Sequence, residues 1–382
     1  MKRNIDFIAL EILCLFIKFD IILFNKSSGV ILMKSDDFRC KNCGGMMRFD
    51  PKSGNLKCEN CETEEELPKV FTHKRHDIDD YEKRIKSKIS EEKTIVQCSS
   101  CGAMVEMGPL ETSKKCPYCD TNIVLSEKAV SVLEPDGIRP FIVDKREIGN
   151  LFSNWIKRRW FAPNVLKNLY QSGKVTGIYL PYWSFDNSAD SEYTAQGGID
   201  RTETYEEDGK TKTRIVTDWY YVSGEVENKF RNVIMRASRT LNDRLLKSLG
   251  GFNVENTINF DSRYLSGYNS EIFKISMRQG YEEAKVKMED EIYNTISSDV
   301  LRRYDRVRDI RYSVYWNDEY YRLLLLPVYS MSYSFNGKSY QIVINGENGK
   351  IVGEYPKSAV KIAIVVILAV IALGLLFYYM NK

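Results

Sequence analysis

The sequence contains very little histidine: only His73 and His76 occur among its 382 residues. Histidine-based metal motifs and the serine–histidine or cysteine–histidine arrangements of many hydrolases need this residue beside other motif residues. Both histidines lie in one charged segment, and we interpret them as solvated residues of a linker. The sequence therefore predicts no catalytic residues, and we do not expect the protein to be an enzyme.

The sequence also lacks an excess of either charge. It has 55 Lys+Arg against 52 Asp+Glu, and residues 33–120 contain 16 basic and 17 acidic residues. A module that neutralised several phosphates of a nucleic acid should be clearly basic. Nucleic acid is therefore disfavoured as a partner, and it stays open only as an alternative.

The cysteines carry the first strong pattern. Eight of the nine form C-x-x-C pairs, the second four repeat the spacing of the first four, and Cys14 stands apart. Two such pairs direct four thiolates at one ion and complete a tetrahedral site with no open position. We therefore predict two structural Zn²⁺ ions. The metal ligands are Cys40, Cys43, Cys58 and Cys61 for one ion, and Cys98, Cys101, Cys116 and Cys119 for the other.

Disulfides, an iron–sulfur cluster and mononuclear iron are the alternatives to zinc. Disulfides need an oxidising compartment, and no cleavable secretory signal is recognised ahead of the cysteines. The short spacing within each pair favours zinc over iron. Each module is expected to be too small to hold a core without its metal.

The last segment is apolar. Residues 362–380 carry no charge over nineteen positions, which as a helix span roughly 28 Å, the thickness of a bilayer core. Lys357 and Lys361 precede this run, and lysines mark the cytoplasmic side. We expect a single-pass, tail-anchored protein of the cell membrane, with a transmembrane helix at 359–380, the lipid bilayer around it and the N-terminal bulk in the cytoplasm.

The first 32 residues have a different character. Their apolar stretch is interrupted by Glu11, Lys18 and Asp20, which makes a poor membrane span. We interpret residues 1–32 as lying upstream of the true start at Met33. The alternative is a weak amphipathic segment that contacts the membrane.

Between these ends the pattern indicates a multidomain chain: two small β-rich zinc ribbons with four cysteine ligands each, then an α+β domain with an antiparallel sheet, then one C-terminal transmembrane helix. The expected boundaries are ribbon one at 33–67, a charged linker at 68–94, ribbon two at 95–122, a linker at 123–139 and the α+β domain at 140–357.

Within the α+β domain the pattern predicts several elements. A capping box at Asp144–Glu147 opens a helix that runs through Trp160, and a short helix follows at 164–172. Further predictions are a strand at 175–186, helices near 237–249 and 279–304, strands at 321–335, 338–344 and 350–354, and turns at 208–209, 336–337 and 345–346. The segments 180–183 and 326–329 look like two copies of one strand motif with buried aromatic residues.

Three segments together with the duplicated cysteine modules carry a family resemblance: 41–51, 179–186 and 343–354. The chain resembles the bacterial TFIIB-type zinc-ribbon membrane proteins, also labelled phage-replication or primosomal-like, over roughly residues 33–357. The resemblance implies a role in holding phage-shock-protein-A-like partners at a stressed membrane. It does not extend to helicase activity, because the sequence lacks the ATP-binding loop.

We therefore expect a membrane-anchored zinc-ribbon adaptor that faces the cytoplasm and recruits or scaffolds protein partners, in the envelope stress response. The alternative is a nucleic-acid-binding zinc-ribbon protein tethered to the membrane.

Overall fold

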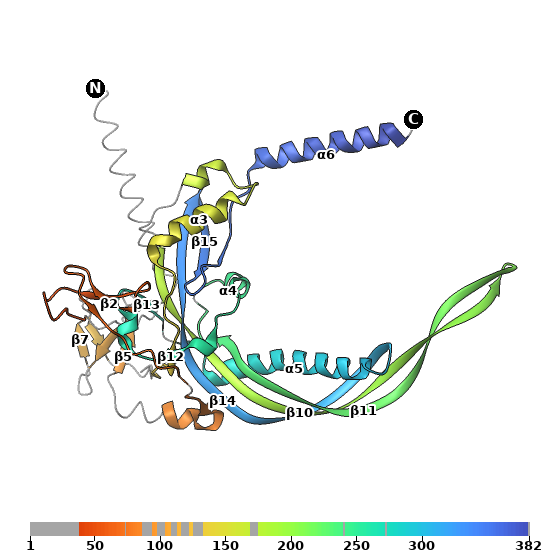
Figure 1. The fold of residues 1–382 in the computed structure, drawn as a ribbon, viewed down its shortest axis with the longest axis horizontal. Coiled ribbons are helices and arrows are strands. Elements are labelled where there is room, and N and C mark those ends of the chain that lie inside the picture. The colour runs from red at the N-terminus through yellow and green to blue at the C-terminus, as the bar shows by residue number, and fades with distance from the viewer. Residues whose placement is uncertain are drawn as a thin grey trace.

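The computed structural model describes residues 38–72, 74–85, 133–168, 175–239, 241–271 and 273–380, and the strands at 94–97, 104–107, 113–115 and 122–124. In the described parts a small cysteine-bearing sheet lies at one end, and a long curved arm leads away from the body (Figure 1).

The small sheet is antiparallel and has the order β1-β2-β3. Its strands are β1 (Met47–Asp50), β2 (Asn55–Cys58) and β3 (Glu64–Glu65). Alternate residues of β1 and β2 are buried, so Met47, Phe49 and Leu56 form one apolar layer, as the period of two in a strand requires. Two further two-stranded pairs, β5 (Thr94–Gln97) with β6 (Met104–Met107) and β7 (Ser113–Lys115) with β8 (Asn122–Val124), belong to the region of the second cysteine set.

The main sheet follows the path β11-β10-β14-β15-β16, with every neighbouring pair antiparallel. Its strands on that path are β10 (Val175–Glu207), β11 (Lys210–Arg236), β14 (Arg306–Phe335), β15 (Lys338–Asn345) and β16 (Ile351–Gly353). Short strands add to its margins: β4 (His76–Asp77), β9 (Gly137–Ile138), β12 (Ile258–Asn259) and β13 (Asn269–Ser270).

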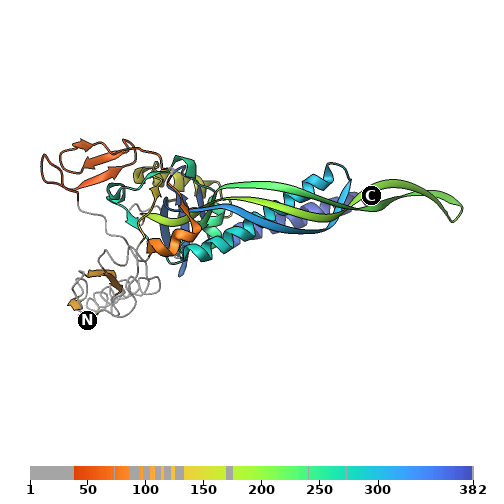
Figure 2. The same ribbon diagram turned by 90° about the horizontal axis from the view of Figure 1, so that it is seen from below.

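The arm consists of the later part of β10, the first part of β11 and the first half of β14. The pairing of β10 with β14 ends at Gly198 and Arg306, whereas β10 and β11 stay paired as far as Glu207 and Lys210. The tip is therefore a two-stranded hairpin, and it continues beyond the other elements (Figure 2). Asp208 and Gly209 close it in left-handed conformations, which confirms the predicted turn.

The helix α5 (Met277–Leu301) lies along the arm (Figures 1 and 2). Its buried residues recur at helical spacing and pack against the inner face of β10, β11 and β14. Ser276 caps its first turn and forms a capping box with Gln279. The predicted helix near 279–304 is therefore confirmed, with its ends moved by two or three residues.

The remaining helices cover the body. They include η1 (Ile78–Asp80), η2 (Lys145–Glu147), α3 (Ile148–Lys157), η3 (Asn164–Asn168), α4 (Asp243–Leu249), η5 (Val254–Asn256) and η6 (Ser262–Leu265). The last helix, α6 (Ala359–Met380), leaves the body on the side where α3 and β15 lie (Figure 1). None of its residues is buried, its most apolar stretch has a mean hydropathy of 3.0, and it is long and apolar enough to cross a membrane.

One predicted capping box and one predicted helix start are wrong. The Asp144 side chain accepts from the backbone N–H of Arg146 and opens the short η2, and Glu147 then precedes α3 without a capping hydrogen bond from its side chain. The predicted capping box is therefore not formed, and α3 ends at Lys157. The helix expected from residue 237 begins only at Asp243, because the backbone N–H of Ala237 donates to Pro181 and continues the sheet.

The charged segment at 68–94 is not simply a linker where the structure describes it. Residues 74–85 add β4 to the edge of β14 and place Ile78 and Tyr81 in the core beneath α5. The side chain of His76 is largely buried, so its interpretation as a solvated linker residue is wrong. His73 lies outside the described residues.

Candidate metal centre

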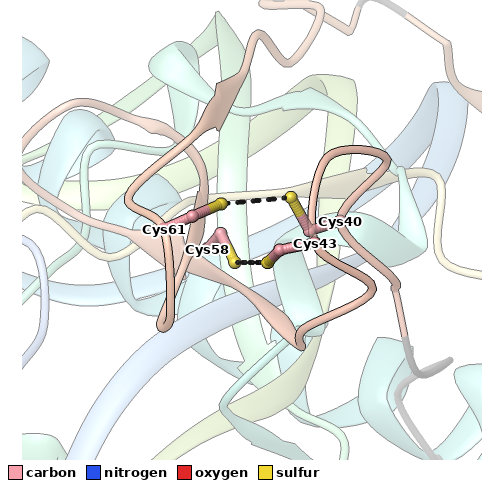
Figure 3. Close-up of side chains that lie close together, drawn as sticks. All are labelled: Cys40, Cys43, Cys58 and Cys61. Atoms are coloured by element: carbon pink, nitrogen blue, oxygen red, sulfur yellow. Dashed lines mark hydrogen bonds between the residues drawn. The ribbon is translucent and has the colours of Figure 1, made fainter.

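Four of the predicted ligands lie together on the small sheet. The sulfurs of Cys40, Cys43, Cys58 and Cys61 are all within 4.8 Å of one another, and Figure 3 shows them facing one another from two opposed loops. The Sγ–Sγ distances are 3.6 Å between Cys40 and Cys61 and 3.5 Å between Cys43 and Cys58.

This geometry fits a metal ion. A disulfide needs about 2.05 Å between its sulfurs, and all four cysteines are free. Four sulfurs at about 2.3 Å from a tetrahedral zinc ion would lie about 3.8 Å apart, close to the distances found. The set contains only thiols and leaves no ligand position to a substrate, so the ion that it suits is structural rather than catalytic.

The two loops have the same backbone design. The N–H of Cys40 donates to the carbonyl of Gly45, and Gly44 donates back to the carbonyl of Cys40. Cys58 pairs in the same way with the two residues at equivalent positions, Thr63 and Glu62. Gly44 and Glu62 both adopt left-handed conformations, with φ of 70° and 59°. Gly44 has no side chain to oppose this conformation, so the turn forms there at no steric cost.

Neighbouring hydrogen-bond donors lower the pKa of two of the four thiols, which favours metal binding. The backbone N–H groups of Cys43 and Asn42 lower the pKa of Cys40, and the Thr63 hydroxyl lowers the pKa of Cys61 to about 6. The N–H of Gly45 lowers the pKa of Cys43, but the sulfurs of Cys61 and Cys58 outweigh it and raise that pKa to about 12. Four thiolates cannot gather here without a cation, so metal binding must release protons.

The small sheet is docked on the body and is not a free module. The Ser266 hydroxyl donates to the carbonyl of Met47 at 2.6 Å, and the N–H of Phe49 donates to the carbonyl of Ser266. The Phe49 ring packs on Tyr264, with ring centroids 5.1 Å apart. The apolar layer of the small sheet therefore belongs to the same core cluster as Phe141 and the rest of the body.

The second predicted set of ligands lies outside the described residues. It comprises Cys98, Cys101, Cys116 and Cys119. The strands nearby are described: β5 ends one residue before Cys98, and β7 ends one residue before Cys116. A second metal site, and two separate ribbons, therefore stay predictions. Within the described part of the chain there is one cysteine cluster suited to a metal ion.

Sequence reasoning missed the residues that fasten the cysteine region to the sheet. Asp136 is buried and accepts hydrogen bonds from His76 at 2.7 Å, from Arg84 at 3.0 Å and from the N–H of Leu323 at 2.9 Å. No motif surrounds Asp136 or Ser266. Their roles depend on partners 52 to 219 positions away, which leave no local signal.

Comparisons with known proteins add one relative. No family model matches the chain, and no solved structure matches it. A protein of Bacillus subtilis strain 168, named uncharacterized protein YdjG, is 27% identical over 331 residues, which cover 85% of this chain and 92% of that protein. The similarity thus extends over most of both chains without indicating an activity.

Proposed function

We propose that the protein is a membrane-anchored adaptor. Its cysteine sheet, its main sheet and its arm face the cytoplasm and recruit protein partners to the inner surface of the cell membrane in the envelope stress response. The partner class is the phage-shock-protein-A-like proteins that the family resemblance implies.

The closed cysteine cluster carries this proposal. A site with four protein sulfurs within 4.8 Å of one another holds an ion without offering it to a substrate. Such a metal stabilises the shape of a surface, and a shaped surface beside a membrane suits recruitment rather than chemistry. We further propose a second zinc ion at the other four cysteines.

The arm supports the same proposal. At about 3.3 Å per residue, the 33 residues of β10, which run from the body to the tip of the arm, correspond to a contour of about 110 Å. β11 is the outermost strand on its side of the described sheet, so its free edge can accept a strand from a partner. Charged side chains along β11, among them Glu225 and Glu227, suppress unspecific pairing at that edge.

The charge of the cysteine sheet disfavours nucleic acid as the partner. Residues 38–72 contain six Lys+Arg and six Asp+Glu, and four thiolates around one Zn²⁺ add a net negative charge. A phosphate-binding module would need the opposite sign. Lys357 and Lys361 at the start of α6 support the cytoplasmic orientation.

The proposal is tested by localisation in cells under membrane stress. A fluorescent fusion of the phage-shock-protein-A-like protein should lose its membrane position when this protein is deleted or carries Cys40→Ser with Cys43→Ser. Lys41→Ser changes an exposed residue between these ligands and should leave recruitment intact.

Unchanged localisation in the deletion strain would contradict the adaptor. Tight nucleic-acid binding by the full chain in detergent, falling steeply with salt, would favour the alternative instead.

A further inference from the structure

Three large apolar side chains are exposed close together beside the N-terminal end of α6. Trp160 and Phe161 lie in the loop between α3 and η3, and Val165 lies in the first turn of η3; their exposed fractions are 55%, 36% and 67%. Single exposed apolar residues are ordinary on a soluble surface, but three within six residues form a patch. We call residues 160–165, which run from the loop after α3 into the start of η3, the α3–η3 loop.

The α3–η3 loop is bonded to the first turn of α6. The ammonium of Lys361 donates to the carbonyl of Trp160 at 2.9 Å, to the carbonyl of Ala162 at 2.8 Å and to Oδ1 of Asn164 at 2.9 Å. The N–H of Ser358 donates to the carbonyl of Phe161 at 2.8 Å. The exposed patch is therefore held beside the point at which α6 begins.

The loop is also anchored to the body. Ala162 is fully buried and belongs to the core cluster that includes α3. Arg159 stacks on the Trp155 ring at 3.7 Å and donates to the carbonyl of Trp155. The apolar side chains of the patch thus point outward from a fixed backbone.

The two segments that meet at the patch carry only basic charge. Neither residues 148–168 nor residues 355–382 contain an acidic residue. Lys157, Arg158 and Lys357 are exposed in these segments. Aromatic side chains among basic ones are typical of the boundary between anionic headgroups and acyl chains.

We propose that the α3–η3 loop is a second membrane contact. Trp160, Phe161 and Val165 insert into the headgroup region of the leaflet that α6 enters, while the basic side chains contact anionic phosphates. The inference rests on the proposed membrane span of α6. The loop is bonded to the first turn of α6, so when α6 spans the bilayer the loop lies at the membrane surface. Its consequence is orientation: a single helix allows the body to swivel, whereas two contacts fix the direction of the arm relative to the membrane.

The test uses the full chain reconstituted into vesicles that contain lipids brominated near the headgroup, which quench nearby tryptophan fluorescence. In vesicles of phosphatidylcholine mixed with phosphatidylglycerol, Trp160→Phe should remove most of the quenching. Trp219→Phe, on the arm strand β11, is the matched control and should remove none. Both variants replace one of five tryptophans.

The outcomes separate the two proposals. Failure of the protein to float with vesicles would contradict the span itself. Flotation with the same quenching in wild type and Trp160→Phe would overturn the second contact while the span holds. If Trp160 were quenched equally in vesicles of phosphatidylcholine alone and in the mixed vesicles, the proposal that the loop contacts an anionic surface would be overturned. Trp160 fluorescence could instead change with the number of protein molecules per vesicle and stay the same when the brominated lipid content changes. That result would overturn the lipid contact in favour of a contact with a second copy of this chain.

Discussion

Nε2 of His76 lies 2.7 Å from Oδ1 of Asp136, a residue 60 positions further along the chain. Arg84 donates to the same oxygen, and the N–H of Leu323 donates to the other. The segment that follows the cysteine sheet is thus fastened to the edge of β14 through one buried carboxylate. The pair explains why a charged, hydrophilic stretch of sequence is part of the folded body.

Asp136 should make stability depend on acid pH. Burial by itself raises the pKa of Asp136, but the hydrogen bond from His76 and the charge of Arg84 outweigh it, so the pKa lies below its ordinary value. A lowered pKa contributes stability that is complete above the ordinary value of about 4 and is lost as the pH falls through the folded value.

Asp136→Asn should therefore reduce the free energy of unfolding by about 3 kcal/mol at neutral pH and flatten its decline below about pH 4. Urea unfolding of the full chain in detergent at a series of pH values measures both effects. Asp309→Asn, at an exposed site, is the control and should change little. If the free energy of unfolding of Asp136→Asn declined at acid pH as steeply as that of the wild type, the role of this carboxylate would be contradicted.

Zinc content should follow the two cysteine sets independently. Cys40→Ser is expected to remove one ion per chain, Cys98→Ser the other, and Lys41→Ser neither, because each site needs all four of its sulfurs. Elemental analysis of the purified full chain measures the ratio. Full zinc content in Cys98→Ser would show that the second set does not bind metal.

The contact between the cysteine sheet and the body should be separable from metal binding. Phe49 is 4% exposed and packs on Tyr264, so Phe49→Ala should cost roughly 3 kcal/mol and loosen the sheet while its zinc stays bound. Hydrogen exchange of β1 reports the loosening. Phe71 is 52% exposed, so Phe71→Ala is the control and should leave the hydrogen exchange of β1 unchanged. Loss of zinc from Phe49→Ala would contradict the prediction, because docking of the sheet and metal binding would then be one event.

Gly197 should tolerate no side chain, although its φ is ordinary. A Cβ there would lie 2.4 Å from the Tyr304 ring, which packs flat on the strand where α5 ends. Gly197→Ala should therefore destabilise the arm by about 1–3 kcal/mol, seen as faster hydrogen exchange at the end of α5. Gly251→Ala, with nothing within 4 Å of its Cβ, is the control, and equal exchange in both variants would contradict the prediction.

The sequence by itself determined the features that depend on neighbouring residues. The C-x-x-C spacing predicted that Cys40, Cys43, Cys58 and Cys61 meet, because each pair lies on a single turn. The apolar run predicted α6, and helical periodicity predicted the helix near 279–304 that the structure shows as α5. The turns at 208–209 and 336–337 followed from residues that adopt positive φ at low cost.

Only the tertiary structure decided how these parts meet. The strand predicted at 175–186 continues to Glu207. As far as Ala195 it gains a buried face because α5 covers it, and beyond Gly198 it continues because it stays paired with β11. The bonds of Ser266 to Met47, of His76 to Asp136 and of Lys361 to Trp160 join positions 60 to 219 apart. Such contacts depend on which surfaces are brought together, and no local pattern records that.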